Sequence, residues 1–592
     1  MRRSAFGVHD GAASLDFIPR PDTFGLEDDI VMPTRDPAQP QRIQRIAEQL
    51  GLDDSNVEPY GWFAGKLSAN LHQRLHNRPQ GKLIGVTAIN PTPFGEGKTV
   101  VSIGLAMGLA RRNKPSIVTL RQPSLAPVFG IKGGGAGGGW SCLLPSDEIN
   151  FHFTGDLHAI AAANNLLAAM LDNHCRRGLT PRLEADNISW RRSIDISDKG
   201  LAEIETGLND VPQAPRRRTG FDLTAASEVM SVLALAEDLQ DLRARLGRIV
   251  VARSSDGGFI TAEEIRAAGA MAALLRTAIR PNLVQTSENT PALVHAGSFA
   301  NISHGNSSVI ADLTALRLAE YVVTESGFGS DLGAEKLFNI KCRTKGLVPR
   351  AEVLVCTVRA LKYHSGRFSV RPGRPLPDAM LTEDLKALRE GFANVRGHLA
   401  HLRQYGIPVV VAINRFPTDT MAELQLVHEL AVEAGADRVA VTEAFSQGGE
   451  GSLELADAVI DACSGTSQFK PLYPLDLSLE EKITQIATRV YGADGVEYSE
   501  GVREQLSHYA ARGYSSLPVC VAKTQYSLSH DAKRLGHPSG FLFPVREVKL
   551  AAGAGFVLVV AEGITLMPGL PREPAAYRID INAAGEIVDA EC

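Results

Sequence analysis

Short apolar runs rich in β-branched residues alternate with longer helical patterns along most of this chain. The runs are KLIGVTAI, PSIVTL, RIVVA, NLVQT, YVVTES, AEVLVCTV, IPVVVAIN and RVAVTEAF. Between several of them lie helical segments such as GDLHAIAAANNLLAAMLDN and GNSSVIADLTALRLAEY. A strand that is apolar throughout is typical of a sheet buried on both faces, and the intervening helices supply the cover. The sequence therefore predicts an α/β fold with a mostly parallel sheet and helices on both faces.

Length, charge and cysteine usage narrow the class of protein further. A chain of 592 residues is too long for one simple core, so several packed subdomains are expected. The formal net charge of -6 argues against general binding to nucleic acid or to a membrane. Seven scattered cysteines without a C-x-x-C pair indicate reduced thiols. With no secretory signal and no long apolar run, we expect a soluble, cytoplasmic protein.

The segment TPFGEGKT, residues 92–99, lies between the run KLIGVTAI and the helical pattern TVVSIGLAMGLARR. In a strand–loop–helix of this kind, backbone N–H groups and the helix dipole favour phosphate. The pattern predicts a P-loop-type nucleotide site, although Thr92 stands where a glycine is usual. Lys98 would reach the outer phosphates, and the Thr99 hydroxyl would bind Mg²⁺. A helix start with an incidental Gly-Lys is the alternative. The predicted nucleotide-binding residues are Thr92, Pro93, Phe94, Gly95, Glu96, Gly97, Lys98 and Thr99.

The next apolar run, PSIVTL, is followed at once by Arg121 and then by a glycine-rich patch. A guanidinium at the end of a strand beside the phosphate loop would face the transferred phosphate, because its planar fork suits phosphate and carboxylate. The patch from Gly133 to Gly139 is interpreted as a close approach of backbone to a ligand, with a flexible linker as the alternative.

Seven motifs carry a resemblance to one family. TPFGEGKT, LRQPSLAPVFGIKGGGAGGGW, INFHFTGDLHAIAAANNLLAA, GFGSDLGAEK, VVVAINRFPTDT, PVCVAKTQYS and MPGLP resemble formate–tetrahydrofolate ligases from about Arg42 to Val588. The resemblance implies that ATP, formate and tetrahydrofolate give ADP, phosphate and 10-formyltetrahydrofolate through formyl phosphate. It also implies Mg²⁺, activation by a monovalent cation (potassium or ammonium) and a homotetramer. By motif match, the catalytic residues are Lys98, which binds the transferred phosphate, and Arg121, which binds formate and formyl phosphate.

The same resemblance assigns the folate and cation sites. The family stacks the pterin on aromatic rings, for which Phe328, Phe416 and Phe445 are the candidates here. Plain core packing is the alternative for each ring. Phe445 stands where the family usually has tryptophan, and a nearby lysine is replaced by Gln447. Gln122 and Asp156 are the predicted ligands of the monovalent cation, with a glutamine in place of the usual glutamate.

The predicted domains follow from these assignments. Residues 1–40 lack periodicity and are predicted to be a poorly ordered extension. Residues 41–370 would form the major nucleotide-binding domain, residues 371–475 a second α/β domain that contributes to the folate site, and residues 476–592 a C-terminal subdomain. Within the last, FLFPVREVKLAAGAGFVLVVAE predicts two strands around a Gly-Ala-Gly turn.

Parts of the sequence point to two other functions. The run VVVAINR resembles the strand before the guanine-reading Asn-Lys-x-Asp motif of GTPases. That motif is rejected because Asp419 follows Asn414 by five residues instead of three and Arg415 replaces its lysine. A folate- or nucleotide-binding homologue with reduced or lost turnover is the second alternative, motivated by Phe445 and Gln447.

Overall fold

The computed structural model describes residues 39–130, 134–208, 215–254, 257–370 and 376–588. These residues lie in one compact unit, Asp36–Cys592. The N-terminal extension predicted over residues 1–40 falls, except for its last two residues, outside the described part. The division of the remainder into three domains stays a prediction.

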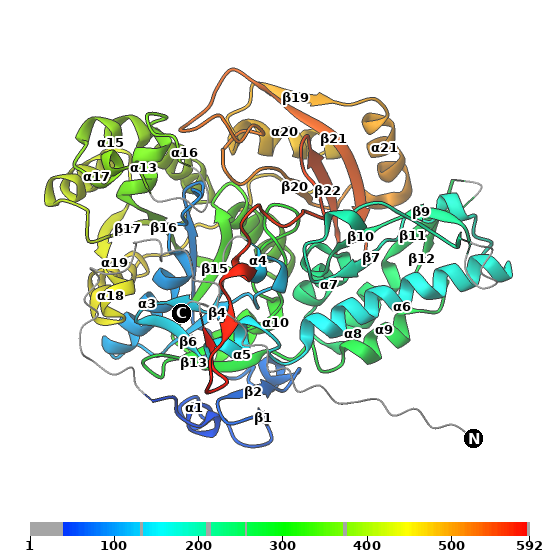
Figure 1. The fold of residues 1–592 in the computed structure, drawn as a ribbon, viewed down its shortest axis with the longest axis horizontal. Coiled ribbons are helices and arrows are strands. Elements are labelled where there is room, and N and C mark those ends of the chain that lie inside the picture. The colour runs from blue at the N-terminus through cyan, green and yellow to red at the C-terminus, as the bar shows by residue number, and fades with distance from the viewer. Residues whose placement is uncertain (1–38, 131–133, 209–214, 255–256, 371–375, 589–592) are drawn as a thin grey trace, which may run out of the picture. The chain divides into compact units, whose positions relative to one another are not determined.

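Seven parallel strands form the centre of a large sheet (Figure 1). Their order is β14-β4-β15-β3-β16-β17-β18, so the strand that precedes the predicted phosphate loop, β3, lies between β15 and β16. This arrangement confirms the mostly parallel α/β sheet expected from the sequence. The bounds are β14 (Pro291–Val294), β4 (Ser116–Leu120), β15 (Tyr321–Gly329), β3 (Lys82–Ala88), β16 (Pro349–Cys356), β17 (Val409–Asn414) and β18 (Arg438–Thr442).

Both faces of this sheet are buried. Along β15, Val322 belongs to one hydrophobic core and Val323 to another. Helix α10 (Val309–Leu318) contributes to the first core, whereas α3 (Lys98–Arg111) and α19 (Leu453–Ala462) contribute to the second. Since consecutive strand residues point to opposite faces, a strand covered on both sides must be apolar at nearly every position. This is the reason for the uninterrupted apolar runs.

The edge of the sheet beyond β14 is antiparallel and includes one of the predicted apolar runs. NLVQT forms β13 (Asn282–Thr286), which runs antiparallel to β14 and β2, whereas RIVVA contributes β11 (Val250–Arg253) to a separate two-stranded sheet with β12 (Phe259–Thr261). The expectation that both would join the parallel sheet was wrong, because apolar composition reports burial but not strand direction. The remaining edge strands are β1 (Val57–Tyr60), β2 (Ala64–Leu67), β6 (Ser141–Leu144) and β5 (Gly137–Gly138).

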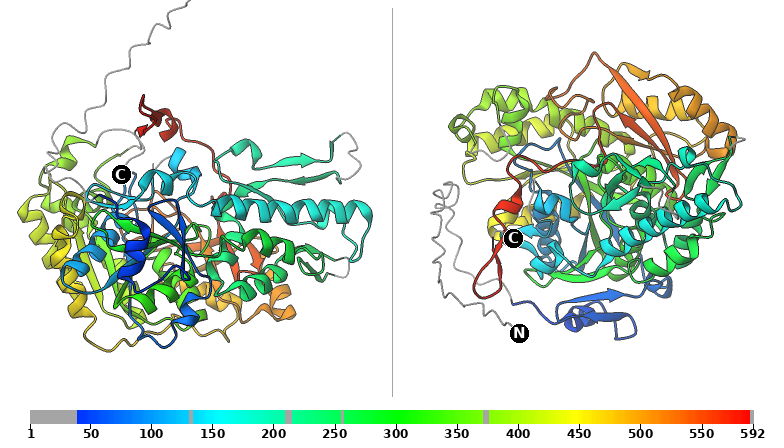
Figure 2. Two further views of the ribbon diagram at one scale, coloured as in Figure 1. Left: turned by 90° about the horizontal axis from the view of Figure 1, so that it is seen from below. Right: turned by 45° about the vertical axis from the view of Figure 1, so that its right-hand side comes forward.

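A second sheet lies near the C-terminus and confirms the predicted strand pair. β21 (Leu542–Ala551) and β22 (Phe556–Ala561) are antiparallel neighbours at its centre, flanked by β19 (Gly495–Tyr498) and β20 (Val519–Ala522). After β22 the chain returns to α4 (Leu125–Phe129), the short helix that follows Arg121 and Gln122 (Figure 2). Met567 is buried there in a small cluster with Ala126 and Leu223, and the Ala575 N–H donates to the Gly130 carbonyl at 2.8 Å.

The other helices surround these sheets. Helices α6 and α8 each pack on α9 at one side of the molecule, whereas α15 packs on α13 and α17 beyond β16 and β17 (Figure 1). Their bounds are α1 (Ile43–Gln49), α2 (Leu71–Arg74), α5 (Ser146–Asn150), α6 (Asp156–Arg177), α7 (Glu228–Leu235), α8 (Leu239–Arg248), α9 (Ala268–Leu275), α11 (Gly333–Lys336), α12 (Arg343–Lys345), α13 (Val358–His364), α14 (Asp378–Leu381), α15 (Leu385–Gly391), α16 (Ala393–Leu402), α17 (Met421–Glu433), α18 (Ala444–Gln447), α20 (Leu479–Arg489) and α21 (Val502–Tyr509). No helix in the described part of the chain is long and apolar enough to cross a membrane.

Candidate functional site

The predicted phosphate loop connects β3 to α3 and contains two glycines in the left-handed region. Gly95 has φ of 73° and Gly97 has φ of 71°. A Cβ on Gly97 would also lie 2.5 Å from the Asn414 amide nitrogen, so glycine is required there for two reasons. The loop thereby turns directly into α3, which begins at Lys98, and directs the helix N-terminus toward the carboxyl end of the sheet.

Glu96 holds this loop closed from inside. Its side chain is buried, and Oε1 accepts hydrogen bonds from the Thr92 N–H and the Thr92 hydroxyl, both at 2.8 Å. Oε2 accepts a third from the Thr357 hydroxyl at 3.1 Å. Asn414 donates to the Glu96 carbonyl at 3.1 Å. Thr92, the departure from the usual glycine, therefore contributes a hydroxyl to the closure of the loop.

Strand β15 brings a carboxylate between the two predicted catalytic regions. Because β15 lies between β3 and β4, its Glu325 meets residues from the segments that follow both strands. The Thr99 hydroxyl donates to Glu325 Oε2 at 2.6 Å, and Arg121 Nη2 lies 3.5 Å from Glu325 Oε1. Burial lowers the pKa of Lys98, an effect that the charges of Glu325 and Glu96 oppose. The structure thus gathers Lys98, Thr99 and Arg121 beyond the carboxyl ends of β3 and β4.

Sequence reasoning missed Glu325, although it had a usable signal. The residue is the second-last of the run YVVTES, and ligand sites in open α/β sheets lie at the carboxyl ends of the strands. What the sequence could not give was the order of strands that places β15 beside both β3 and β4.

These residues fit a magnesium–nucleotide. Two left-handed glycines and a helix N-terminus offer N–H groups to phosphate, and the Thr99 hydroxyl with the Glu325 carboxylate offers oxygen ligands. Within the described ranges, no three His, Cys, Asp or Glu side chains gather as a self-sufficient metal site. Magnesium bound together with phosphate needs only one or two protein ligands, so the oxygen pair suffices.

Arg121 is held against the loop that follows β14. Its Nη1 donates to the Ser298 carbonyl at 3.1 Å, and its Nε is buried with no hydrogen-bond partner among the described residues. A Cβ on Gly327 would lie 2.8 Å from Arg121 Nη1, so the glycine makes room for the guanidinium. The side chain is 21% exposed, which leaves part of its surface accessible.

The glycine-rich patch makes close approaches to protein atoms in its described part, Gly134–Gly139; Gly133 lies outside that part. A Cβ on Gly139 would lie 2.3 Å from the Phe445 carbonyl oxygen, and the neighbouring Trp140 N–H donates to the same carbonyl at 2.8 Å. The glycines therefore allow α18 to pack closely against the chain near β5 and β6. Contact with a ligand stays a prediction.

The three predicted stacking rings differ in their surroundings. Phe445 is 41% exposed on α18, with Gln447 in the same helix donating to Glu443 at 2.9 Å. Phe416 is half-buried, and the Arg359 guanidinium carbon lies 3.6 Å from its ring centre. Phe328 has φ of 58°, an unusual conformation for a residue other than glycine, and lies three positions after Glu325 in β15.

The two predicted cation ligands also differ. The Asp156 carboxylate is 3% exposed and accepts hydrogen bonds from the Lys66 ammonium at 2.6 and 2.7 Å, from Thr154 at 3.1 Å and from Asn282 at 2.9 Å. Gln122 is 4% exposed, and its Oε1 is buried with no hydrogen-bond partner among the described residues. Gln122 therefore has an oxygen available to a cation, whereas the Asp156 carboxylate is already paired with Lys66.

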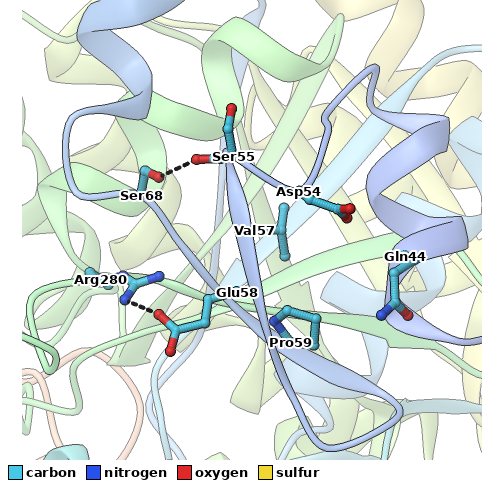
Figure 3. Close-up of a pocket in the computed structure, with 8 residues that line it drawn as sticks. All are labelled: Gln44, Asp54, Ser55, Val57, Glu58, Pro59, Ser68 and Arg280. Carbon is cyan, nitrogen blue, oxygen red and sulfur yellow. Dashed lines mark hydrogen bonds and ion pairs between the residues drawn. The ribbon is translucent and has the colours of Figure 1, made fainter.

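Two hollows elsewhere contain none of the predicted site residues. One of about 560 Å³ lies beside the edge strand β1, where Arg280 bonds to Glu58 at 2.6 Å (Figure 3). The other, of about 790 Å³, lies between β7 (Arg192–Ile194), β11 and the C-terminal sheet. The candidate site is therefore defined by the strand ends and the phosphate loop.

Comparison with known proteins agrees with these features. A family model described as formate–tetrahydrofolate ligase matches residues 29–590. A formate–tetrahydrofolate ligase of Roseiflexus sp. (strain RS-1) is 53% identical over 546 residues, which cover 92% of this chain and 97% of the relative. Those of Saccharopolyspora erythraea and Aeromonas hydrophila subsp. hydrophila are 52% and 51% identical, covering 92% and 95% of this chain and 96% and 99% of the relatives. With motifs, fold and relatives in agreement, the chain belongs to the formate–tetrahydrofolate ligase family.

Proposed function

We propose that this protein joins formate to tetrahydrofolate at the expense of ATP, giving 10-formyltetrahydrofolate, ADP and phosphate. The observation that carries the proposal is the convergence of Lys98, Thr99, Glu325 and Arg121 at the carboxyl ends of three adjacent strands, in a chain of this family. The same convergence favours a working ligase over a homologue that only binds folate or nucleotide.

The chemistry explains why cationic groups are needed. Formate is a poor electrophile because carboxylate resonance shields its carbon. A formate oxygen attacks the terminal phosphorus of ATP, ADP leaves, and formyl phosphate results. The folate amine then attacks the formyl carbon, phosphate leaves with the electron pair, and the amine loses its proton. Lys98 and Arg121 position the reacting anions and offset the charge on the phosphoryl group in flight. The Thr99 hydroxyl and the Glu325 carboxylate would hold Mg²⁺, which would offset further negative charge on the phosphates.

We assign the pterin to the aromatic candidates, with Phe445 as the most exposed ring. Phe416 and Phe328 complete this assignment, which the motif match supports. Phenylalanine in place of tryptophan keeps an aromatic face but offers less area and no N–H donor.

A monovalent cation, potassium or ammonium, is assigned to the neighbourhood of Gln122. Its Oε1 supports this, since it is buried without a hydrogen-bond partner in the described part of the chain and hard cations prefer oxygen ligands. Asp156 would contribute through its charge, which Lys66 already offsets in part. A homotetramer and a cytoplasmic location are further proposals taken from the family resemblance and the composition.

One assay tests the function. ADP formation should depend on both formate and tetrahydrofolate, and ¹⁸O-labelled formate should leave one labelled oxygen in the phosphate product. Nucleotide binding without formate-dependent turnover would favour the binding homologue. Turnover with the label kept only in the formyl group or in water would reject formyl phosphate as the intermediate.

A further inference from the structure

Arg359 on α13 contacts both the phosphate loop and one of the predicted folate rings. Its Nη2 donates to the carbonyls of Phe94 and Gly95, at 3.4 and 3.3 Å. Its guanidinium carbon lies 3.6 Å from the centre of the Phe416 ring and 5.0 Å from that of the Phe94 ring. A single side chain thus spans two ligand regions whose motifs lie more than three hundred residues apart.

The Phe416 side of this contact is well fixed. Phe416 lies in the turn after β17, where its N–H donates to Asp419 Oδ2 at 2.8 Å and its carbonyl accepts from the Asp419 N–H at 2.9 Å. The turn holds the backbone, and Arg359 supports the ring. The guanidinium therefore lies against a ring whose backbone is held in place.

The phosphate-loop side is fixed by the same helix. Thr357 caps the N-terminus of α13 and donates to Glu96, the carboxylate that closes the loop. The Phe94 ring also packs edge-on against Tyr363 of α13, with centroids 6.2 Å apart. Helix α13 therefore holds the loop at three places, and Arg359 is the contact that also reaches Phe416.

We propose that Arg359 is a positioning residue that couples the nucleotide loop to the folate ring Phe416. The inference rests on the proposed function, in which these two regions bind ATP and tetrahydrofolate. Arginine suits the task because its planar guanidinium lies flat on an aromatic ring while its edge donates to carbonyls, which the point charge of lysine cannot do. A change at Phe416 thus alters the geometry around Phe94 and Gly95.

The test measures Mg·ADP binding by calorimetry in the absence of folate, so that turnover is not required. Phe416→Ala should weaken Mg·ADP binding by about 2- to 30-fold, the effect of losing one cation–π contact. Arg359→Lys should weaken it to a similar degree. In the Arg359→Lys background, Phe416→Ala should then have little further effect, because the link is already broken.

The matched control is Arg343→Lys. Arg343 also lies over an aromatic ring, 4.6 Å from the centre of Tyr473, and donates to the Tyr473 carbonyl at 2.6 Å, but it contacts neither the loop nor Phe416 in the described part of the chain. It should leave Mg·ADP affinity within about twofold of wild type. In the steady state, Arg359→Lys should raise the KM of both ATP and tetrahydrofolate while the KM of formate stays unchanged, a pattern that general destabilisation does not give.

The outcomes separate this inference from the proposed function. Wild-type protein that fails to bind Mg·ADP would remove the proposed function itself. If wild-type protein binds Mg·ADP and Phe416→Ala binds it with the same affinity, the coupling is overturned but the proposed function is not. Additive losses in the double variant would also overturn it, because independent effects do not need a shared arginine.

Discussion

At the scale of single residues, the site depends on a carboxylate that touches two predicted catalytic regions. Glu325 accepts from Thr99 and lies beside Arg121, so its negative charge holds both groups in place before anionic ligands arrive. Pre-organised charge of this kind is effective because little reorganisation is needed during reaction.

Arg121 should be essential for its shape as well as its charge. We expect Arg121→Ala to lower kcat by about 10²-fold or more, the usual cost of losing one donor to a developing charge. Arg121→Lys should recover little of this, because lysine lacks the planar fork. The measurement is formate-dependent ADP release. A wild-type rate in either variant would reject the assignment.

Phe445 should contribute to folate binding through its exposed ring. By analogy with bases stacked on aromatic side chains, Phe445→Ala should cost about 1–3 kcal/mol of binding free energy. Phe445→Trp should tighten binding, since it restores area and an N–H donor. Titration of tetrahydrofolate by calorimetry checks both, and unchanged affinity in the pair would show that the ring does not contact the pterin.

Gln122 should make the response to potassium weaker than a carboxylate would. Gln122→Glu adds a negative charge where the Oε1 now lacks a hydrogen-bond partner among the described residues, so less potassium should be needed for half-maximal activity. Initial rates across potassium concentrations, at constant ionic strength, measure this. An identical potassium dependence in the two proteins would place the cation elsewhere.

At the scale of elements, β16 contains a buried carboxyl group that influences stability. Glu352 is fully buried, packs over Gly85 of β3, and neither carboxyl oxygen has a hydrogen-bond partner in the described ranges. Burial raises the pKa of Glu352 well above its usual value of 4.5. The folded protein therefore keeps this proton after the unfolded chain has lost it.

The sign of the resulting pH dependence follows directly. As the pH rises above about 4.5, the unfolded chain releases the proton and the folded chain does not, so the contribution of Glu352 to stability falls. The side chain in Glu352→Gln cannot titrate. The unfolding temperature of this variant, relative to that of wild type, should therefore increase as the pH rises. Thermal unfolding at several pH values measures this, with the exposed Glu429→Gln as the control. A constant difference between variant and wild type would mean that Glu352 does not titrate as described.

At the scale of the whole molecule, elements that are adjacent in the sequence could be predicted, whereas the pairing of distant strands could not. KLIGVTAI and the helix after TPFGEGKT could be predicted because strand, loop and helix are adjacent in sequence. The direction of the strand NLVQT could not be predicted, since it is set by pairing with β14 and β2. The role proposed for Arg359 could not be predicted either, since it depends on contacts with Phe94 and Phe416. Periodicity reports which residues are buried, but strand order is set by packing between distant segments.

The C-terminal segment should be needed for catalysis although it lies far from Arg121 in sequence. Ending the chain at residue 563 removes Met567 and Ala575, which pack and bond against the α4 region. We expect a loss in kcat of about 10²-fold from misplacement of the residues around Arg121. A chain ending at residue 578 keeps both contacts and should remain active. Equal activity of the two truncated chains, with unchanged circular dichroism, would contradict this.

The position of β3 also affects how the protein is made. Its two neighbours in the sheet, β15 and β16, begin at Tyr321 and Pro349, more than two hundred residues after β3 ends at Ala88. At about 5–20 residues per second, a ribosome takes about 10–50 s to synthesise the intervening chain. During that time an apolar strand remains without its partners, which is the kind of segment that chaperones protect. The predicted phosphate loop is thus translated early but completed only after most of the chain has emerged.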